Sequence, residues 1–258
     1  MLEENIMNKE LIHKSEEMAV IKKLYYIIDE YAREYDLPNT KRILPVANEL
    51  LAQSQDAPFH VKELSYVHLS SCMQECKMLI DLMLPVSERE MDLMLAATFG
   101  HVLCEIVYFP DHGEELRRLY AMDEEAYRIV QILNRKNLRE EAYYEQVKKN
   151  KISLIIKLVE MAIITEQFFR LSFHKIEDYI RLDREFFFPM CIYAKEYYPE
   201  LALSVSTIME KVKLLADVTE ILSRRYRDRR RALIDEMLVL QEENARIRVS
   251  IRELEAEK

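Results

Sequence analysis

The chain has 258 residues, of which 50% are hydrophobic and 32% are charged, with two Gly, seven Pro and no Trp. Dinucleotide-binding turns, phosphate-binding loops and barrels of tight hairpins need several positions that only glycine tolerates, so this composition excludes them. The formal net charge of −9 argues against nucleic-acid binding, which draws much of its affinity from lysine and arginine. Strong helix formers are abundant and turn residues are scarce, which predicts an all-α protein.

Hydrophobic periodicity predicts a series of helices along the chain. The expected ranges are 8–35, 39–55, 64–84, 88–107, 114–121, 124–135, 139–149, 152–170, 172–197 and a long final helix that begins at Pro199. Ser87 and Glu90 have the spacing of a capping box, which places a helix start at residue 88. The helix that follows is apolar on nearly every side, so we expect it at the centre of a bundle. Loops are expected at Asp56–Glu63 and, as the sharpest break, at Phe109–Gly113.

The C-terminal part changes in character, so we expect a helical bundle over residues 1–210 and a long helix with a short coiled coil over residues 211–258. Apolar residues alternate three- and four-residue steps, as in the a and d positions of a heptad. The seam contains Met237, Leu240, Asn244, Ile247, Ile251 and Leu254. This pattern favours a homodimer through residues 233–254, with Asn244 fixing the register and Glu243 pairing with Arg248 of the second copy. The alternative is one helix that folds back on its own domain.

A basic run, Arg224–Arg231, precedes the heptads. A basic region before a zipper is typical of one class of DNA-binding protein. This run is short, contains Asp228 and lacks an asparagine in the preceding turns. We therefore interpret it as a solvated helix face or a surface for an acidic partner.

No apolar run approaches the roughly 20 residues that span a bilayer. The first residues are too acidic and polar for a signal peptide. The cysteines, Cys72, Cys76, Cys104 and Cys191, fall inside expected helices without the spacing of a disulfide framework. These features predict a cytoplasmic protein with reduced thiols and no membrane association.

Two histidines and an acid stand in apolar helical surroundings, namely His68, His101 and Glu160. Burying such groups is costly unless they are paired or bound. Convergent imidazoles and carboxylates in a helical bundle are one way to hold a divalent metal ion. The alternative is that each is a hydrogen-bonded core residue.

The order of these residues resembles the motifs of the HD-domain phosphohydrolases. The similarity is greatest to the guanosine tetraphosphate (ppGpp) hydrolase domain of stringent-response proteins and covers about residues 27–220. That family has a first histidine, then HDxxED, then K-L/A-A/S-D-R-x-x-N. The corresponding stretches here are YVHL at residues 66–69, HVLCEI at 101–106 and KLVEMAII at 157–164. The resemblance implies an HD-type helical bundle and a Mn²⁺-like ion that polarises a phosphate and activates water.

Several positions depart from these motifs. Val102 stands where the family has an aspartate ligand, and Glu160 replaces the last aspartate. Ile106 replaces the second acid of the ED pair, leaving Glu105 as the candidate water-activating base. Met161 and Ile164 replace the arginine and asparagine of the third motif, and Leu69 replaces a proline. Nearly every change exchanges a polar group for an apolar one, as expected when a cavity no longer holds an ion.

We therefore expect a degenerate, noncatalytic HD-domain protein that serves as a binding module for a protein partner or a guanine nucleotide, without a cofactor. In this interpretation His68, His101 and Glu160 are vestigial metal ligands and Glu105 is a vestigial base. The alternative is an active phosphohydrolase in which these three residues hold Mn or Zn. A third alternative, a purely structural coiled-coil adaptor, explains the C-terminal helix and not the motifs.

Overall fold

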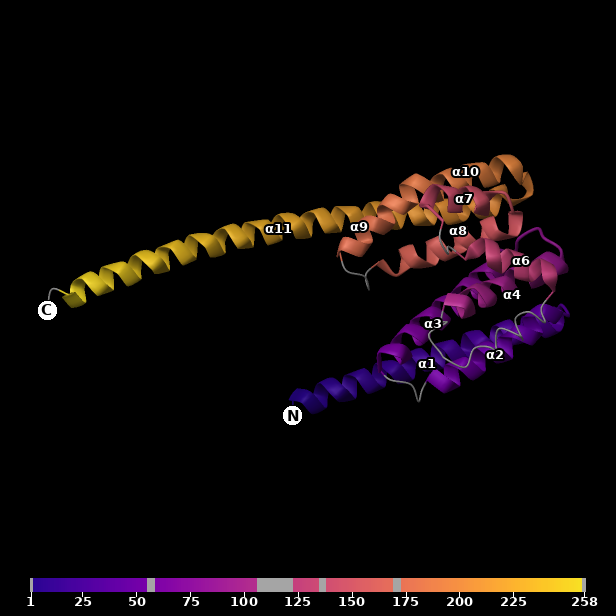
Figure 1. The fold of residues 1–258 in the computed structure, drawn as a ribbon, viewed down its shortest axis with the longest axis horizontal. Helices are drawn as coiled ribbons and strands as arrows, with labels where there is room; N and C mark the ends of the chain where they lie inside the picture. Colours follow the sequence, from indigo (N-terminus) through magenta and orange to yellow (C-terminus); the bar gives the residue numbers. More distant parts are fainter. Residues whose placement is uncertain (1, 55–58, 106–122, 135–137, 169–172, 257–258) are drawn as a thin grey trace.

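The computed structural model describes residues 2–54, 59–105, 123–134, 138–168 and 173–256 of the chain. Within these ranges the protein contains helices and no strand, which confirms the all-α prediction (Figure 1). The α-helices are α1 (Leu2–Glu34), α2 (Pro38–Ser54), α3 (Phe59–Asp81), α4 (Glu88–Glu105), α6 (Glu124–Leu133), α7 (Glu140–Lys148), α8 (Lys151–Glu166), α9 (Phe173–Leu182), α10 (Phe188–Tyr197) and α11 (Ala202–Ala256).

The predicted helix starts are partly confirmed. The capping box is present, because the Ser87 amide donates to Glu90 Oε2 at 2.9 Å and the Glu90 amide donates to Ser87 Oγ at 3.2 Å. The loop expected at residues 56–63 is wrong over its second half, since α3 already begins at Phe59. The predicted break at 109–113, the helix at 114–121 and the residue-172 helix start lie outside the described residues.

Helices α4 and α8 form the centre of the bundle. Every residue from 91 to 103 in α4 is buried, and the helix packs against α2, α3, α6 and α8. Helix α8 packs in turn against α3, α6, α7, α10 and α11. The two helices that carry the second and third motifs are therefore neighbours, and the central position of α4 is the one that its all-round apolar pattern predicts.

A buried carboxylate joins α4 to the start of α2. Asp92 Oδ1 accepts hydrogen bonds from the Thr40 amide and from Thr40 Oγ1, both at 2.8 Å. Asp92 Oδ2 accepts from the Asn39 amide at 3.0 Å and from Asn39 Nδ2 at 2.9 Å. The first amides of a helix have no partner within the helix and carry partial positive charge, so a carboxylate from another helix satisfies them. Asn39 Oδ1 also accepts from the Asp123 amide at 3.0 Å, which ties the beginning of α6 to the same point.

One π-helical turn, Asp183–Phe187, separates α9 from α10. The Phe188 amide reaches back to the Asp183 carbonyl, five residues earlier. Pro189, the next residue, has no amide hydrogen and its ring clashes with the carbonyl four residues before it, so a regular α-helix cannot continue through this point. The wider turn allows the chain to remain helical, and it places Asp183 on the side of α8.

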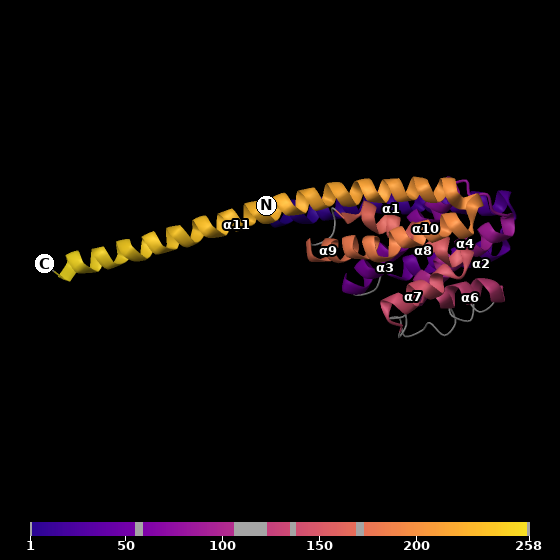
Figure 2. The same cartoon turned by 90° about the horizontal axis from the view of Figure 1, so that it is seen from above.

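Helix α11 has two parts with different surroundings. Its first part packs against α8, α9 and α10 and buries apolar side chains including Val205, Ile208, Val212 and Ala216. Its second part, from residue 224 to residue 256, extends away from the bundle, and we call it the projecting arm (Figures 1 and 2). The domain division expected at residue 210 lies inside this continuous helix, and burial on the bundle side continues to Ser223.

Candidate functional site

The second and third motifs meet inside the bundle. His101 of α4 and Glu160 of α8 lie with Nε2 and Oε2 at 3.9 Å. His68 of α3 is close enough to this carboxylate to interact with it electrostatically, and a positive charge on His68 helps to lower the pKa of Glu160. The three helices pack pairwise, so the residues that the sequence singled out come from neighbouring elements.

Glu160 has a closer partner on its own helix. Lys157 Nζ donates to Glu160 Oε1 at 2.6 Å, and the two side chains are 11% and 17% exposed. Burial by itself raises the pKa of the Glu160 carboxyl, but attraction to Lys157, and more weakly to His101, lowers it overall. Burial acts to lower the pKa of the Lys157 ammonium, and attraction to Glu160 raises it well above its usual value. The pair therefore remains charged on both sides at neutral pH.

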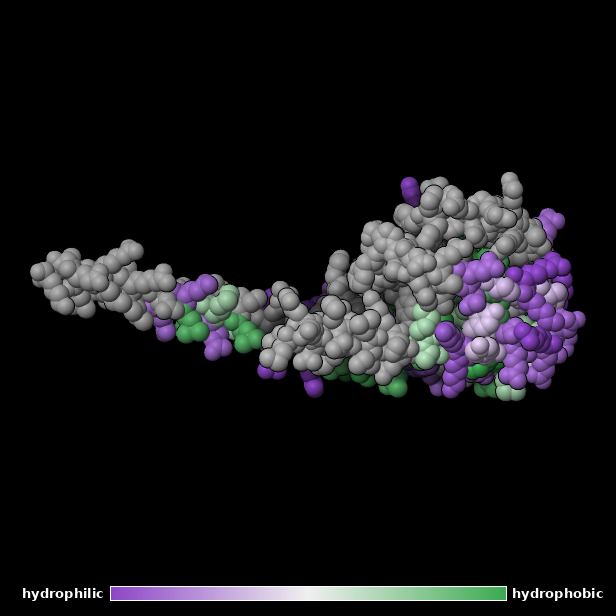
Figure 3. Space-filling model, turned by 90° about the horizontal axis from the view of Figure 1, so that it is seen from below, coloured by the Kyte–Doolittle hydropathy of each residue, from purple (hydrophilic) through white to green (hydrophobic). Residues whose placement is uncertain are grey.

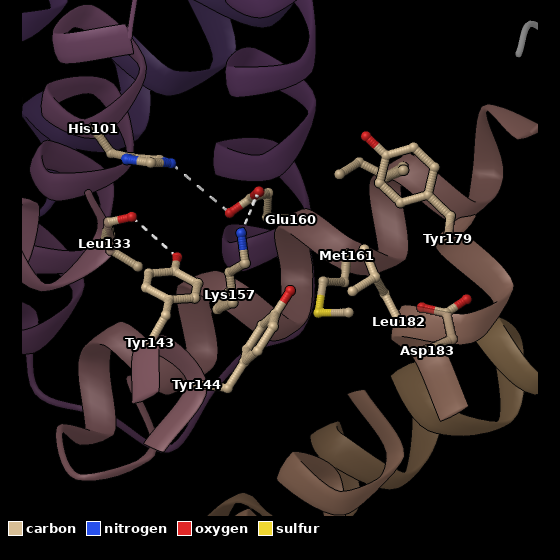
Figure 4. Close-up of a pocket in the computed structure, with 11 residues that line it drawn as sticks. His101, Leu133, Tyr143, Tyr144, Lys157, Glu160, Met161, Tyr179, Leu182 and Asp183 are labelled. Carbon is tan, nitrogen blue, oxygen red and sulfur yellow. Dashed lines mark hydrogen bonds and ion pairs between the residues drawn. The ribbon is translucent and has the colours of Figure 1, made fainter. Parts of the chain in front are cut away.

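A cavity of about 160 Å³ lies beside this ion pair (Figure 4). We call it the Lys157 cavity. It is lined by His101, Leu133, Tyr143, Tyr144, Lys157, Glu160, Met161, Ile164, Tyr179, Leu182 and Asp183. A volume of this size is close to that of an engineered cavity of ~150 Å³ that binds benzene. The space therefore fits one ring or one small charged group.

Tyrosine rings form much of the cavity wall. The Tyr143 hydroxyl donates to the Leu133 carbonyl at 3.0 Å, and burial raises the pKa of this phenol to about 12. Lys157 Nζ lies 5.5 Å from the centroid of the Tyr143 ring, within reach of a cation–π interaction. Tyr144 stacks on Phe186 with ring centroids 4.2 Å apart. These contacts hold both rings in place around the ion pair.

Asp183 is a site residue that the sequence analysis did not identify. It is 2% exposed and lines the Lys157 cavity from the π-helical turn. Thr165 Oγ1 lies 3.2 Å from Asp183 Oδ2, and burial raises the pKa of the Asp183 carboxyl to about 7. Pro189 was the available sequence signal, because it predicts an interruption of the helix near this residue. It does not predict which side chain the interruption turns inward.

The described residues do not provide the donor set that the HD resemblance implies. Among them, no group of three or more His, Cys, Asp or Glu side chains could hold a metal ion. Val102 is 5% exposed and places hydrocarbon where the HD resemblance would expect an aspartate ligand, and Lys157 Nζ donates to one oxygen of Glu160. The Glu105 side chain lies outside the described part of the structure.

Comparisons of this chain with models of protein families, with curated proteins and with solved structures find no match. The structure adds that no helix among the described residues is long and apolar enough to cross a membrane. No disulfide joins the cysteines, all of which lie in described helices, and Cys72, Cys76 and Cys191 are buried.

Proposed function

We propose that the protein is a noncatalytic binding module, related in its motifs to HD-domain ppGpp hydrolases, which uses the Lys157 cavity to hold a small ligand. The observation that carries this proposal is the buried hydrocarbon of Val102 next to the contact between His101 and Glu160. The resembling family also has a lysine three residues before its metal-binding acid, so the pair of Lys157 with Glu160 does not by itself distinguish this chain from the hydrolase.

Electrostatics favours this interpretation over the hydrolase. A divalent ion at Glu160 would stand close to the Lys157 ammonium, and in the resembling family, which has the same lysine, aspartate ligands supply the negative charge that offsets this repulsion. The lost aspartate at Val102 also removes negative charge that would offset this repulsion. Lys157 donates to Glu160 Oε1 only, whereas Glu160 Oε2 has no hydrogen-bond partner among the described residues and lies 3.9 Å from His101 Nε2.

The size of the cavity limits the ligand. Sites for drug-sized molecules usually have roughly 300–1,000 Å³. The Lys157 cavity, at about 160 Å³, is smaller, so it does not enclose a whole guanosine tetraphosphate. A guanine nucleotide, one of the ligands expected from the sequence, could place only one of its groups in this cavity. A molecule small enough to be enclosed fits the volume better than a nucleotide does.

A second role, self-association, is favoured by the projecting arm. Leu233, Met237 and Leu240 are 57%, 50% and 52% exposed, at the spacing of successive d, a and d positions. Figure 3 shows hydrophobic side chains gathered on the arm between polar ones. We propose that a second copy of the chain covers this stripe through residues 233–254. The basic run at 224–231 then lies at the base of the arm, where Arg224 pairs with Glu220 and Arg227 with Glu177.

Two measurements on the purified protein test the noncatalytic role. After dialysis against Mn²⁺ or Zn²⁺, elemental analysis should find well under one equivalent of metal. With guanosine tetraphosphate and Mn²⁺, no pyrophosphate should be released above the rate without protein. A stoichiometric metal that His101→Ala removes would contradict the proposal. Pyrophosphate release that Glu105→Gln abolishes would establish the hydrolase instead.

A further inference from the structure

The Lys157 cavity contains one acidic group that no basic residue among the described ones neutralises. Asp183 is nearly fully buried, and within the described part of the chain no lysine, arginine or histidine forms an ion pair with it. Its hydrogen-bond partner is Thr165, whose hydroxyl also lies 2.9 Å from the Met161 carbonyl. A hydroxyl has a single hydrogen. When Thr165 donates to Met161, Asp183 can complete its own hydrogen bond only by carrying a proton.

The charges around the cavity leave Asp183 as the unbalanced one. Lys157 and Glu160 neutralise each other on α8, and Thr165 on the same helix is uncharged. On α10, burial raises the pKa of the Cys191 thiol, and the charge of Asp183 raises it further. This thiol therefore stays protonated. The remaining polar lining groups are His101 on α4, Tyr143 and Tyr144 on α7 and Tyr179 on α9. An ionised Asp183 therefore leaves the lining one negative charge in excess, apart from any charge on His101.

We propose that the Lys157 cavity binds a small organic monocation, with its ammonium group paired to Asp183 and its carbon skeleton against Tyr144, Met161 and Leu182. This ligand class rests on the proposed noncatalytic role. The cavity volume of about 160 Å³ sets the size at roughly one six-membered ring. A buried carboxylate gains more from a paired ammonium than from water, and tyrosine faces also attract cations. In Figure 4 the Asp183 side chain stands beside Leu182, across Met161 from the ion pair.

Binding of a cation to Asp183 is coupled to loss of its proton. Because the carboxyl has a pKa of about 7, the ligand must displace a proton at pH 6 and meets the charged form at pH 8. We expect the affinity for the cation to be about tenfold higher at pH 8 than at pH 6. The reason is that the ionised fraction of a carboxyl falls about tenfold for each pH unit below its pKa, and is nearly complete above it. A ligand held by hydrophobic contact alone would not show this dependence.

Piperidinium is a suitable probe, and tetrahydropyran is its uncharged counterpart of similar shape. Calorimetric titration at constant ionic strength should show that piperidinium binds at pH 8, binds about tenfold more weakly at pH 6, and outcompetes tetrahydropyran at pH 8. Asp183→Asn should abolish piperidinium binding, whereas Asp217→Asn, which changes an exposed acid on α11, should leave it intact. Thermal unfolding of both variants checks that they are folded.

Three results would overturn the proposal: no binding of piperidinium at millimolar concentration, equal affinity for tetrahydropyran, or an affinity that Asp183→Asn leaves unchanged. None of these affects the noncatalytic role, which fails only if the protein takes up stoichiometric metal or hydrolyses the nucleotide. The ligand class and the proposed function can therefore fail separately.

Discussion

Lys157 and Glu160 are one helical turn apart on α8, and their side chains meet at 2.6 Å at the wall of the cavity. Most lysine–glutamate pairs with this spacing lie in solvent and contribute little to stability. This pair is largely buried, and its lysine ammonium also faces the Tyr143 ring. Loss of this pair would therefore change both the stability of the bundle and the charge at the wall of the cavity.

Removal of Lys157 should be strongly destabilising. In Lys157→Met the Glu160 carboxylate loses its closest positive charge, and an unpaired buried charge costs about 3–5 kcal/mol. The double variant Lys157→Met/Glu160→Gln removes the charge and should recover most of this loss. Urea unfolding measures both. An exposed pair gives the control, since Arg128→Met, which removes the partner of Glu124, should change stability by less than about 1 kcal/mol. Equal costs for Lys157 and Arg128 would contradict the buried role.

The Asp183 carboxyl should make the protein less stable as the pH rises from about 4 to about 7. Its pKa is raised from an ordinary value near 3.8 to about 7, so the folded state holds a proton that the unfolded state has lost. This contribution is fully present below pH 4 and is lost as the pH rises through 7. About three units correspond to roughly 4 kcal/mol. Asp183→Asn should remove that part of the pH dependence. Urea unfolding at pH 5 and pH 8 should show that the free energy of unfolding of the variant, relative to that of the wild type, is higher at pH 8 than at pH 5. An unchanged pH profile would count against a buried, protonated Asp183.

Asp92 should be essential for the junction of α2 and α4. Asp92→Ala leaves the Asn39 and Thr40 amides without their acceptor, whereas the Thr40 hydroxyl keeps the Asp92 carbonyl at 3.3 Å, and hydrogen bonds to a charged group contribute about 1.5–3 kcal/mol each. We expect a loss of about 3 kcal/mol or more, measured by thermal or urea unfolding. Ser87→Ala, which removes an exposed helix cap, should cost only about 1 kcal/mol. A similar small loss for both would show that the buried network is dispensable.

The projecting arm should determine the oligomeric state. Met237→Glu and Leu240→Glu place charge on the apolar stripe and should shift the protein toward monomers in light scattering after gel filtration. Val239→Glu is the matched control, because Val239 is 56% exposed but lies off the stripe, at position c. Truncation after Asp235 should also give monomers. Asn244→Ile should raise the melting temperature while allowing other oligomers. An oligomeric state that survives truncation would refute the role of the arm.

Much of the fold was predictable because helix signals are local. The Ser87–Glu90 capping box and the apolar face of residues 91–103 predicted where α4 begins and that it is central. The motif order also predicted that His101 and Glu160 would approach each other, at 3.9 Å in the structure. The start of α3 was misplaced, because Pro58 and the polar residues before it were interpreted as a longer loop. Asp92 was not identified, since a cap supplied by another helix leaves no local pattern.

Residue types and their spacing were sufficient to predict that this chain is helical, and to show apolar residues at four positions where the resembling family has polar ones, namely Val102, Ile106, Met161 and Ile164. That Lys157 pairs with Glu160, and that Asp183 lines the same cavity with no basic partner among the described residues, could be learned only from the packing of the helices. The reason is physical. Whether a charged side chain is paired depends on burial and on groups from other helices, and neither is encoded at any fixed distance along the chain.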